Sequence, residues 1–310
     1  MTWLIWRRQR TALLGLAALT AATIVVLAVG RLTYTSAIAQ SGIAADCLAD
    51  PACATPALFD ISARYALFWG LGHSFLLVFP LSVGLLAGSA VFGRDVEDGT
   101  HVFALTQEAS HRRWFTTGLL LCGSVALAAA AVVSVVAGWA YAPFEASAGG
   151  ALLETPEFEE SGIVPLGYTA LAFAVAATAG LLSRSTLAGI VSTIAVFAVV
   201  LFSLAVLVRP HYLPPLTATF PLDQFGTPDG AWGLDYTYLG ALGEEVSPTC
   251  PSNSTTCTAS QFLRATYQPS ERYWPFQLIE SAILAVLTGA TLTLGRTRLR
   301  HLAHAGARER

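Results

Sequence analysis

Residues 93–114 read GRDVEDGTHVFALTQEASHRRW and form a polar stretch between two long apolar runs, 65–92 and 115–141. The contrast is strong because 54% of the chain is hydrophobic and only 12% is charged. Soluble domains carry about 25% charged residues, so this composition indicates a protein embedded in lipid. Each flanking run exceeds the roughly 20 helical residues that cross a hydrocarbon core. The polar stretch therefore predicts a loop between two membrane-spanning helices.

Six apolar runs are long enough to span a membrane as helices. They are residues 11–30, 65–92, 115–141, 164–182, 186–208 and 275–294. Four of them contain no Asp, Glu, Arg, Lys or His, whereas the second contains His73 and the last contains Glu280. We therefore expect an all-α integral membrane protein with six transmembrane helices, in which residues 1–310 form one domain.

Arginine residues indicate the orientation of these helices, since cytoplasmic flanks are enriched in positive charge. With the N-terminus inside the cell, twelve of the seventeen basic residues fall on the cytoplasmic side. For a multi-pass protein of the plasma membrane, this orientation gives an interfacial segment at 1–10, a cytoplasmic loop at 93–114, a large extracellular loop at 209–274 and a cytoplasmic tail at 295–310. The alternative for the first run is a cleaved signal peptide, but about 20 residues exceed the apolar region of such a peptide.

Four of the five cysteines fall in the expected outer loops. Cys47 and Cys53 lie in the first of these loops, and Cys250 and Cys257 lie in the last. Their local spacing predicts the disulfides Cys47–Cys53 and Cys250–Cys257, since disulfides persist outside the cell. Other pairings, or four free thiols, stay open as alternatives at this stage.

The chain contains no lysine, which excludes several classes of enzyme. A Walker A phosphate-binding loop and a Schiff-base site both require a lysine. The sequence also contains no G-x-S-x-G, H-E-x-x-H or C-x-x-C motif, so the common hydrolase and zinc signatures are absent. His301 and His304 have the spacing of metal ligands, but without further ligands nearby they indicate a solvated tail. We expect no catalytic activity, no bound cofactor and no metal in this chain.

Polar and small residues inside the apolar runs are the first candidates for function. Charged groups within a membrane span are costly and usually face a cavity or a partner. His73 and Glu280 could pair or line an outer cavity for a cationic or amphipathic substrate. Alternatively, helix packing satisfies His73, and Glu280 pairs with Arg209. Gly84 and Gly88 have the G-x-x-x-G spacing that lets two helices approach closely, either within one subunit or in a dimer.

Two outer loops are large and carry no clear motif. Residues 145–160 are acidic and rich in glycine, which indicates a solvated loop. Residues 209–273 are rich in proline, glycine and aromatic residues. For this second loop we expect a small cap with helical turns.

Within residues 93–114, acidic residues precede an apolar pattern. Negative charge is favourable at the start of a helix, so the pattern predicts a short helix across the membrane surface. Its acidic start consists of Asp95, Glu97 and Asp98, its turn of Gly99 and Thr100, and its apolar contact of Val102, Phe103 and Leu105.

This stretch resembles the first cytoplasmic loop of bacterial ABC transporter permeases of the ABC-2 type. Their pattern is an acidic pair, Gly-Thr, an apolar patch and then Ser-Arg-x-x-Trp or similar, and DVEDGTHVFALTQEASHRRW is similar to it. The N-terminal residues 3–10, WLIWRRQR, also resemble the Trp-Arg-Gln start common in such permeases. The chain departs from the pattern at Asp98, where a basic or neutral residue is common, and at His111, where arginine often stands. The six expected helices extend the resemblance over the whole chain.

The resemblance implies the transmembrane subunit of a type V ABC exporter. In that family the loop forms a coupling helix that docks on an ATP-binding subunit, and two permeases assemble with two ATPases. Carried over to this chain, Glu97, Gly99 and Thr100 form the docking turn, and the partner subunit binds ATP and magnesium. A second permease copy completes the transporter. The implied substrate is a drug-like, peptide or lipid-like amphipathic compound, and nucleic acid is not a partner.

Two other classes of protein are the alternatives. A membrane-embedded sensor or assembly subunit could use the same loop to bind a soluble partner. A membrane-bound enzyme would be built on His73 and Glu280, although no nucleophile or metal-binding set accompanies them in the sequence.

Overall fold

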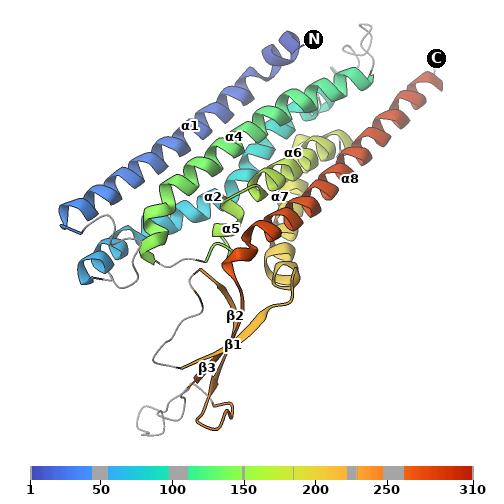
Figure 1. Ribbon diagram of the computed structural model, residues 1–310. Coiled ribbons are helices and arrows are strands. Elements are labelled where there is room, and N and C mark those ends of the chain that lie inside the picture. Colours follow the sequence, from blue (N-terminus) through green and yellow to red (C-terminus); the bar gives the residue numbers. More distant parts are fainter. Residues whose placement is uncertain are drawn as a thin grey trace.

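The computed structural model describes residues 2–43, 55–97, 111–148, 151–183, 185–221, 228, 230–246 and 262–308. Over these residues the chain is a bundle of long helices with a small β-sheet beyond one end (Figure 1). The helices are α1 (Thr2–Gln40), α2 (Pro56–Glu97), α4 (His111–Ala148), α6 (Val164–Ser183), α7 (Thr186–Phe202) and α8 (Tyr273–Arg308), and a single turn, α5 (Glu157–Glu160), precedes α6.

Five of the described helices are long and apolar enough to cross a membrane, namely α1, α2, α4, α7 and α8. The remaining expected span is α6, whose apolar stretch, Val164–Gly180, is shorter. The prediction of a mostly helical membrane protein is therefore confirmed. In Figure 1, α1 begins and α8 ends at the same end of the bundle, opposite the sheet. We refer to these two ends as the terminal end and the sheet end.

The connection between α2 and α4 differs in length from the loop expected at residues 93–114. The last turns of α2 continue to Glu97, and α4 already begins at His111. Helical geometry therefore extends into both ends of the polar stretch. Residues 98–110, which carry most of the expected coupling helix, lie outside the described residues.

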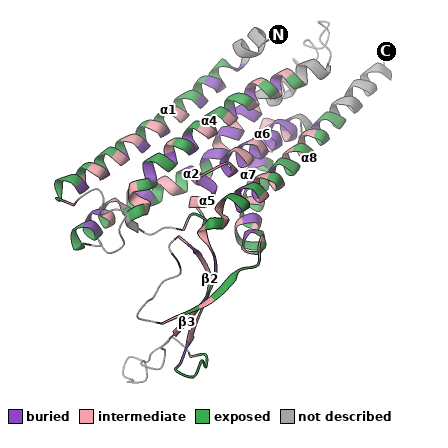
Figure 2. Cartoon of the chain, viewed as in Figure 1, coloured by how far each residue is buried: buried purple, intermediate pink, exposed green. Residues whose placement is uncertain are grey.

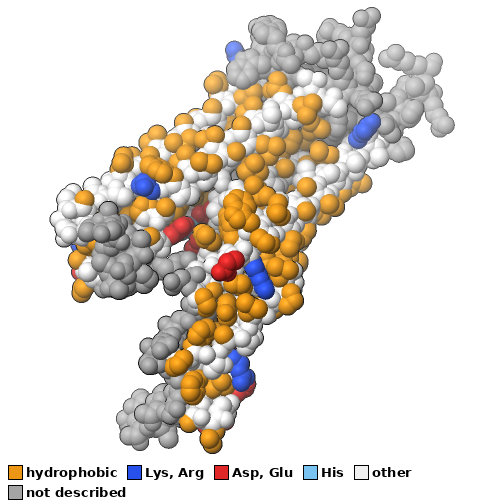
Figure 3. Space-filling view, viewed as in Figure 1, with side chains coloured by type: hydrophobic (Ala, Val, Ile, Leu, Met, Phe, Trp, Pro, Cys, Tyr) orange, Lys and Arg blue, Asp and Glu red, His pale blue; other side chains and the backbone are white. Residues whose placement is uncertain are grey.

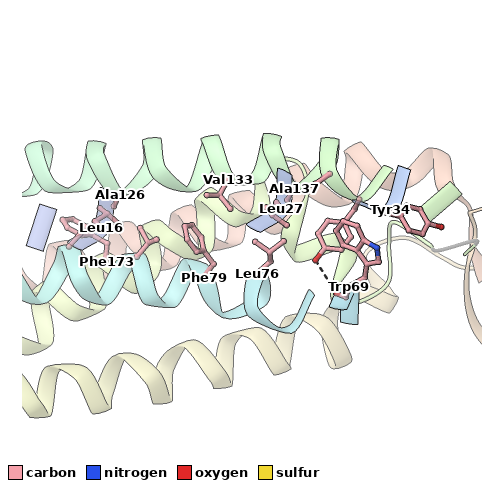
Figure 4. Packing of buried hydrophobic residues seen from close by; sticks show 14 of the residues in the cluster. Leu16, Leu27, Tyr34, Trp69, Leu76, Phe79, Ala126, Val133, Ala137 and Phe173 are labelled. Atoms are coloured by element: carbon pink, nitrogen blue, oxygen red, sulfur yellow. Dashed lines mark hydrogen bonds between the residues drawn. The ribbon is translucent and has the colours of Figure 1, made fainter. Parts of the chain in front are cut away.

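Buried side chains form two apolar clusters in the bundle. The first joins α1, α2 and α4 and contains the aromatic residues Tyr34, Trp69 and Phe79 (Figure 4). The second joins α6, α7 and α8 with the turn α5, and Phe158 and Tyr168 belong to it. Buried residues follow the inner faces of the helices, and exposed residues follow their outer faces (Figure 2). The core therefore holds together helices that are far apart in the sequence.

Small residues allow α2 to pack closely against α6. A Cβ atom added at Gly84 would lie 2.5 Å from the Cβ of Ala172, and one added at Gly88 would lie 2.6 Å from the carbonyl oxygen of Phe173. Both distances are well inside van der Waals contact, so the two positions require glycine. The G-x-x-x-G face of α2 is therefore covered by α6 of the same chain, in the manner of small-residue contacts between membrane helices.

The outward faces of several helices are apolar and exposed. On α7, Leu187, Val191 and Val199 are 70%, 58% and 64% exposed, and Val286 on α8 is 72% exposed. Hydrophobic side chains cover much of the bundle in Figure 3. Soluble monomers rarely expose continuous apolar areas of this extent, because water disfavours them. The described helices thus have the surface of a membrane-embedded protein.

A three-stranded antiparallel sheet is present where a cap with helical turns was expected between α7 and α8. Its strands are β1 (Leu216–Pro221), β2 (Trp232–Leu239) and β3 (Phe262–Gln268), in the order β1-β3-β2. Along β3, Leu263, Ala265 and Tyr267 are buried and the residues between them are partly exposed. Successive side chains of a strand point to opposite faces, which explains this alternation. The expected helical turns are limited to short segments beside the sheet.

Gln268 fixes the sheet to the bundle. Its fully buried side chain donates hydrogen bonds to the carbonyl oxygens of Pro210 at 3.1 Å and Leu213 at 2.8 Å. Its Oε1 accepts from Nη1 of Arg272 at 2.5 Å, and the same nitrogen donates to the carbonyl oxygen of Pro214. These bonds hold the end of β3 against the segment that follows α7.

Candidate functional site

A cluster of buried ionisable side chains lies toward the sheet end of the bundle. Its buried members are Glu159 and Glu160 from α5, Arg209 from the segment after α7, and Glu280 from α8, and the partly buried His73 from α2 lies beside them. Ionisable groups inside a membrane protein are costly and therefore mark candidate functional sites. Four separate elements meet at this cluster.

The turn α5 brings two acidic residues into the bundle. Glu159 and Glu160 are only 2% and 7% exposed. The expectation of a solvated loop over residues 145–160 is therefore wrong for this part of it. The physical reason is that Leu153 and Phe158, on either side of the turn's start, are fully buried in the apolar cluster of α6, α7 and α8. Burial of these two side chains carries the neighbouring carboxyl groups inward.

Gln277 of α8 holds this turn in place. Its Oε1 accepts hydrogen bonds from the backbone N–H groups of Ile163 and Val164, both at 2.9 Å. Its Nε2 donates to the carbonyl oxygens of Phe158 at 3.0 Å and Ser161 at 3.1 Å. A single amide therefore satisfies backbone groups at the end of α5 and the start of α6, which would otherwise be unpaired in an apolar interior.

Gly162 makes this capping arrangement possible. Its φ angle of 68° lies in the left-handed region that glycine adopts without a steric penalty. A Cβ atom at this position would lie 2.6 Å from Oε1 of Gln277. Any larger residue would therefore both strain the turn and displace the capping amide.

Arg209 follows an irregular end of α7. The helix passes into a π-helical segment, Ser203–Val208, and then into a 3-10 turn, Arg209–His211. Such departures from α-helical geometry are frequent at functional sites. They place the guanidinium group, which is fully buried, between α5 and α8.

Every nitrogen of the Arg209 guanidinium has a partner. Nε donates to Oε2 of Glu280 and Nη2 donates to Oε1 of Glu280, each at 3.0 Å. Nη1 donates to the hydroxyl of Thr155 at 3.1 Å, and Nη2 also donates to Glu159. The guanidinium carbon lies 4.1 Å from the ring centroid of Phe158. The bidentate geometry with Glu280 is the strongest form of arginine–carboxylate contact.

Glu280 is saturated with hydrogen bonds. Besides the two bonds from Arg209, it accepts one from the hydroxyl of Tyr168 at 2.9 Å and one from the hydroxyl of Tyr212 at 3.0 Å. A carboxylate has about four acceptor positions, so none is left for a substrate in this conformation. Of the alternatives drawn from the sequence, the structure shows the pair with Arg209.

His73 contacts a different carboxyl group. Its Nδ1 lies 2.8 Å from Oε2 of Glu160. The imidazole ring also packs on Tyr141, with ring centroids 4.0 Å apart. Ser134 of α4 donates to the backbone carbonyl oxygen of Glu160 at 3.1 Å. His73 and Glu280 therefore belong to one cluster of buried groups, but each has its own partner.

Both glutamates of α5 have a raised pKa. Burial, together with the negative charges of Glu157, Glu159 and Glu145, raises the pKa of Glu160 to about 10. Burial also raises the pKa of Glu159, because lost hydration outweighs the nearby positive charge of Arg209. A proton on this pair avoids placing two like charges side by side in the interior.

The remaining predicted residues lie away from this cluster or outside the described residues. Asp95 and Glu97 lie in the last turns of α2. Outside the described residues are Asp98, Gly99, Thr100, Val102, Phe103 and Leu105, together with Cys47, Cys53, Cys250 and Cys257. The coupling helix and both disulfides therefore stay predictions. The fifth cysteine, Cys122, is buried and free in α4.

Glu159, Glu160 and Gln277 were not predicted from the sequence as members of the cluster. A usable signal exists for the two glutamates, because only three residues separate Glu160 from the apolar run that begins at Val164. Acidic residues this close to a span must lie at the membrane boundary. No comparable signal exists for Gln277, whose role depends on the position of a turn more than one hundred residues earlier.

Comparison with known protein families gives one match. A family model described as "ABC-2 membrane transporter related" matches residues 17–209, which is more than half of the chain. The matched segment begins in α1 and ends at Arg209, so it includes His73, Glu159 and Glu160 but neither the sheet nor α8. No curated protein and no solved structure matches the chain.

Proposed function

The chain belongs to the ABC-2 membrane transporter related family, and from this premise we propose that it is the permease subunit of an ABC exporter of the plasma membrane. It moves an amphipathic substrate, such as a drug-like, peptide or lipid-like compound, out of the cell. A separate subunit binds ATP and magnesium and hydrolyses the ATP. The chain itself has no catalytic activity and binds no cofactor.

The observation that carries this proposal is the family match over residues 17–209. The match contains the whole connection between α2 and α4, which is the segment we propose as the coupling element. Membership in the family implies an ATP-binding partner, and the arginines at 94, 112 and 113 favour a cytoplasmic position for this connection. We propose that Glu97, Gly99 and Thr100 contact the ATP-binding subunit.

The buried cluster at the sheet end supports a role in gating. Arg209 and Glu280 join the segment after α7 to α8, while His73 and Glu160 join α2 to α5. A substrate path that opens toward the sheet end must separate these elements, so the two pairs together act as an outer lock. ATP binding in the partner subunits then shifts the equilibrium between locked and open states.

The assembly that we propose contains two permease copies, each with an ATP-binding subunit. The exposed apolar faces of α7 and α8 contact either lipid or the second copy. The G-x-x-x-G face of α2 is not available for this contact, because Gly84 and Gly88 pack against α6 of their own chain.

The test is co-expression of this chain with a candidate ABC ATP-binding subunit. We expect the two to co-purify, and we expect Glu97→Arg and Gly99→Pro each to abolish both the association and the permease-stimulated ATP hydrolysis. Glu271→Arg is the matched control, because it reverses an exposed charge at the sheet end. Association that survives both coupling variants would favour a sensor or assembly subunit that binds its partner elsewhere.

A further inference from the structure

A small cavity lies between α2, α4, α5 and the start of α6. Its volume is about 10 Å³, which is room for about one water molecule. Most of its lining is apolar, and its polar residues are Ser134, Glu159 and Glu160. The cavity therefore lies beside both acidic residues of the buried cluster.

Each glutamate has one carboxyl oxygen without a hydrogen-bond partner in the protein. These atoms are Oε2 of Glu159 and Oε1 of Glu160, and both are buried. The other oxygen of each group is occupied, by Arg209 and Thr155 for Glu159 and by His73 for Glu160. An unpaired buried acceptor is energetically unfavourable, because it has lost its hydrogen bonds to water. A water in the cavity can donate one hydrogen to each of the two oxygens.

The cluster holds three carboxyl groups, those of Glu159, Glu160 and Glu280, but only one guanidinium group and one imidazole. Arg209 makes a bidentate contact with Glu280 and a single contact with Glu159, so one positive charge is shared between two carboxyl groups, and Glu160 has only the imidazole of His73. Ca²⁺ and Mg²⁺ take six or more oxygen ligands, whereas the residues lining the cavity offer two free carboxyl oxygens and one hydroxyl. No group of three metal-binding side chains occurs in the described part of the chain. A proton meets the charge requirement without further ligands.

Other ionisable groups surround the pair from each neighbouring element. They are His73 on α2, Tyr141 and Glu145 on α4, Glu157 on α5, Tyr168 on α6, Arg209 and Tyr212 after α7, and Tyr273 and Glu280 on α8. Acidic groups outnumber basic ones in this set, so the surroundings favour retention of a proton at neutral pH.

A route to solvent leads through His73. Its side chain is 12% exposed, whereas that of Glu160 is 5% exposed. Glu145 and Glu157, which interact electrostatically with His73, are partly exposed. Figure 3 shows acidic side chains in a recess of the bundle near its sheet end. The imidazole therefore stands between this outer region and the buried carboxyl group.

We propose that Glu160 binds an exchangeable proton, that a water in the cavity bridges its second oxygen to Glu159, and that His73 relays the proton to solvent. The proton leaves Oε2 of Glu160 for Nδ1 of His73, and the ring releases the proton of its other nitrogen to water. The reverse sequence reloads the site. When the proton is lost, Glu160 becomes a buried carboxylate next to Glu159 on the same turn, which raises the energy of this conformation of α5.

The test is an infrared pH titration of the full chain in lipid nanodiscs, without an ATP-binding subunit. We expect a protonated-carboxyl band that persists at neutral pH and is lost toward about pH 10 in the wild type. Glu160→Gln removes this band. Glu154→Gln keeps it, because Glu154 is an exposed glutamate six residues earlier in the same segment.

A second measurement follows the exchange rate after a pH jump. We expect His73→Phe to keep the band and to slow its disappearance by about 10²-fold or more, which is the usual contribution of a positioned proton carrier. The absence of a titrating band above neutral pH in the wild type, or its survival in Glu160→Gln, would overturn the proton site. An unchanged rate in His73→Phe would overturn the relay. None of these outcomes depends on ATP hydrolysis, so they leave the proposed transport function untouched.

Discussion

Arg209 and Glu280, 71 residues apart in the sequence, form two parallel hydrogen bonds of 3.0 Å with side chains that are both fully buried. The pair joins the irregular end of α7 to α8 and is surrounded by aromatic residues, including Phe158 and Tyr168. In an apolar interior neither charge is tolerable without the other. This contact therefore fixes where α7 ends relative to α8.

Removal of one partner of this pair is predicted to be strongly destabilising. We expect Arg209→Gln to lower the free energy of unfolding by about 3–5 kcal/mol, because Glu280 is left as an uncompensated buried charge. The measurement is denaturant unfolding of the purified protein in mixed micelles. The control is Arg264→Gln, which removes an exposed pair with Glu245 at 3.6 Å and should cost less than about 1 kcal/mol. Equal losses in the two variants would contradict the prediction.

Removal of both partners is predicted to lower the free energy of unfolding by less than removal of one partner. The double variant Arg209→Leu with Glu280→Leu leaves no buried charge of this pair without its partner. Its loss of unfolding free energy should therefore be smaller than the sum of the losses caused by Arg209→Leu and Glu280→Leu separately. A double-mutant cycle in the same micelle assay gives the coupling energy. The prediction fails if the double variant loses as much unfolding free energy as the two single variants lose together, or more, because the pair then has no favourable coupling.

Because α2 approaches α6 closely, alanine substitutions at two glycines of α2 are predicted to differ strongly in their effect on stability. Gly84→Ala introduces a Cβ atom 2.5 Å from Ala172, and overpacking of this kind costs about 1–3 kcal/mol. Gly70→Ala is the matched control, because a Cβ atom at Gly70 of the same helix has nothing within 4 Å. Thermal unfolding in detergent measures both. Destabilisation by Gly70→Ala as large as that by Gly84→Ala would rule out packing as the cause.

Gln277 is predicted to be essential for the position of α5. Gln277→Ala leaves two backbone N–H groups and two carbonyl oxygens without their partner, and each unpaired buried group costs about 1–3 kcal/mol. We therefore expect faster hydrogen–deuterium exchange at Ile163 and Val164. Thr293→Ala, on an exposed face of α8, is the control and should leave this exchange unchanged.

The stability of the protein is predicted to depend on pH through Glu160. The pKa of this carboxyl group rises from 4.5 to about 10 on folding, so between these values the folded state holds a proton that the unfolded state has released. The resulting stabilisation is complete below about pH 4.5 and is lost as the pH rises toward 10, with a slope of at most about 1.4 kcal/mol per pH unit. Unfolding measured from pH 6 to 9 should show a steeper decline for the wild type than for Glu160→Gln. Parallel curves would contradict this assignment.

The expected helices could be read from the sequence because apolar length is a property of contiguous residues. Each of the runs 11–30, 65–92, 115–141, 186–208 and 275–294 lies within a longer helical segment that is apolar enough to cross a membrane. The family resemblance rests on local sequence in the same way, and the match over residues 17–209 confirms it. The sheet was harder to foresee, because its strands have only six to eight residues each.

The sequence by itself therefore determined that this protein is helical, embedded in a membrane and related to ABC-2 permeases, since hydrophobic run length and a local loop pattern carry that information. Only the tertiary structure decided that Glu280 pairs with Arg209, that His73 pairs with Glu160, and that Gln277 caps the turn between them. The physical reason is that a polar group in an apolar interior must find a partner, but the close packing of α6 against α2 and α8 selects which group that is.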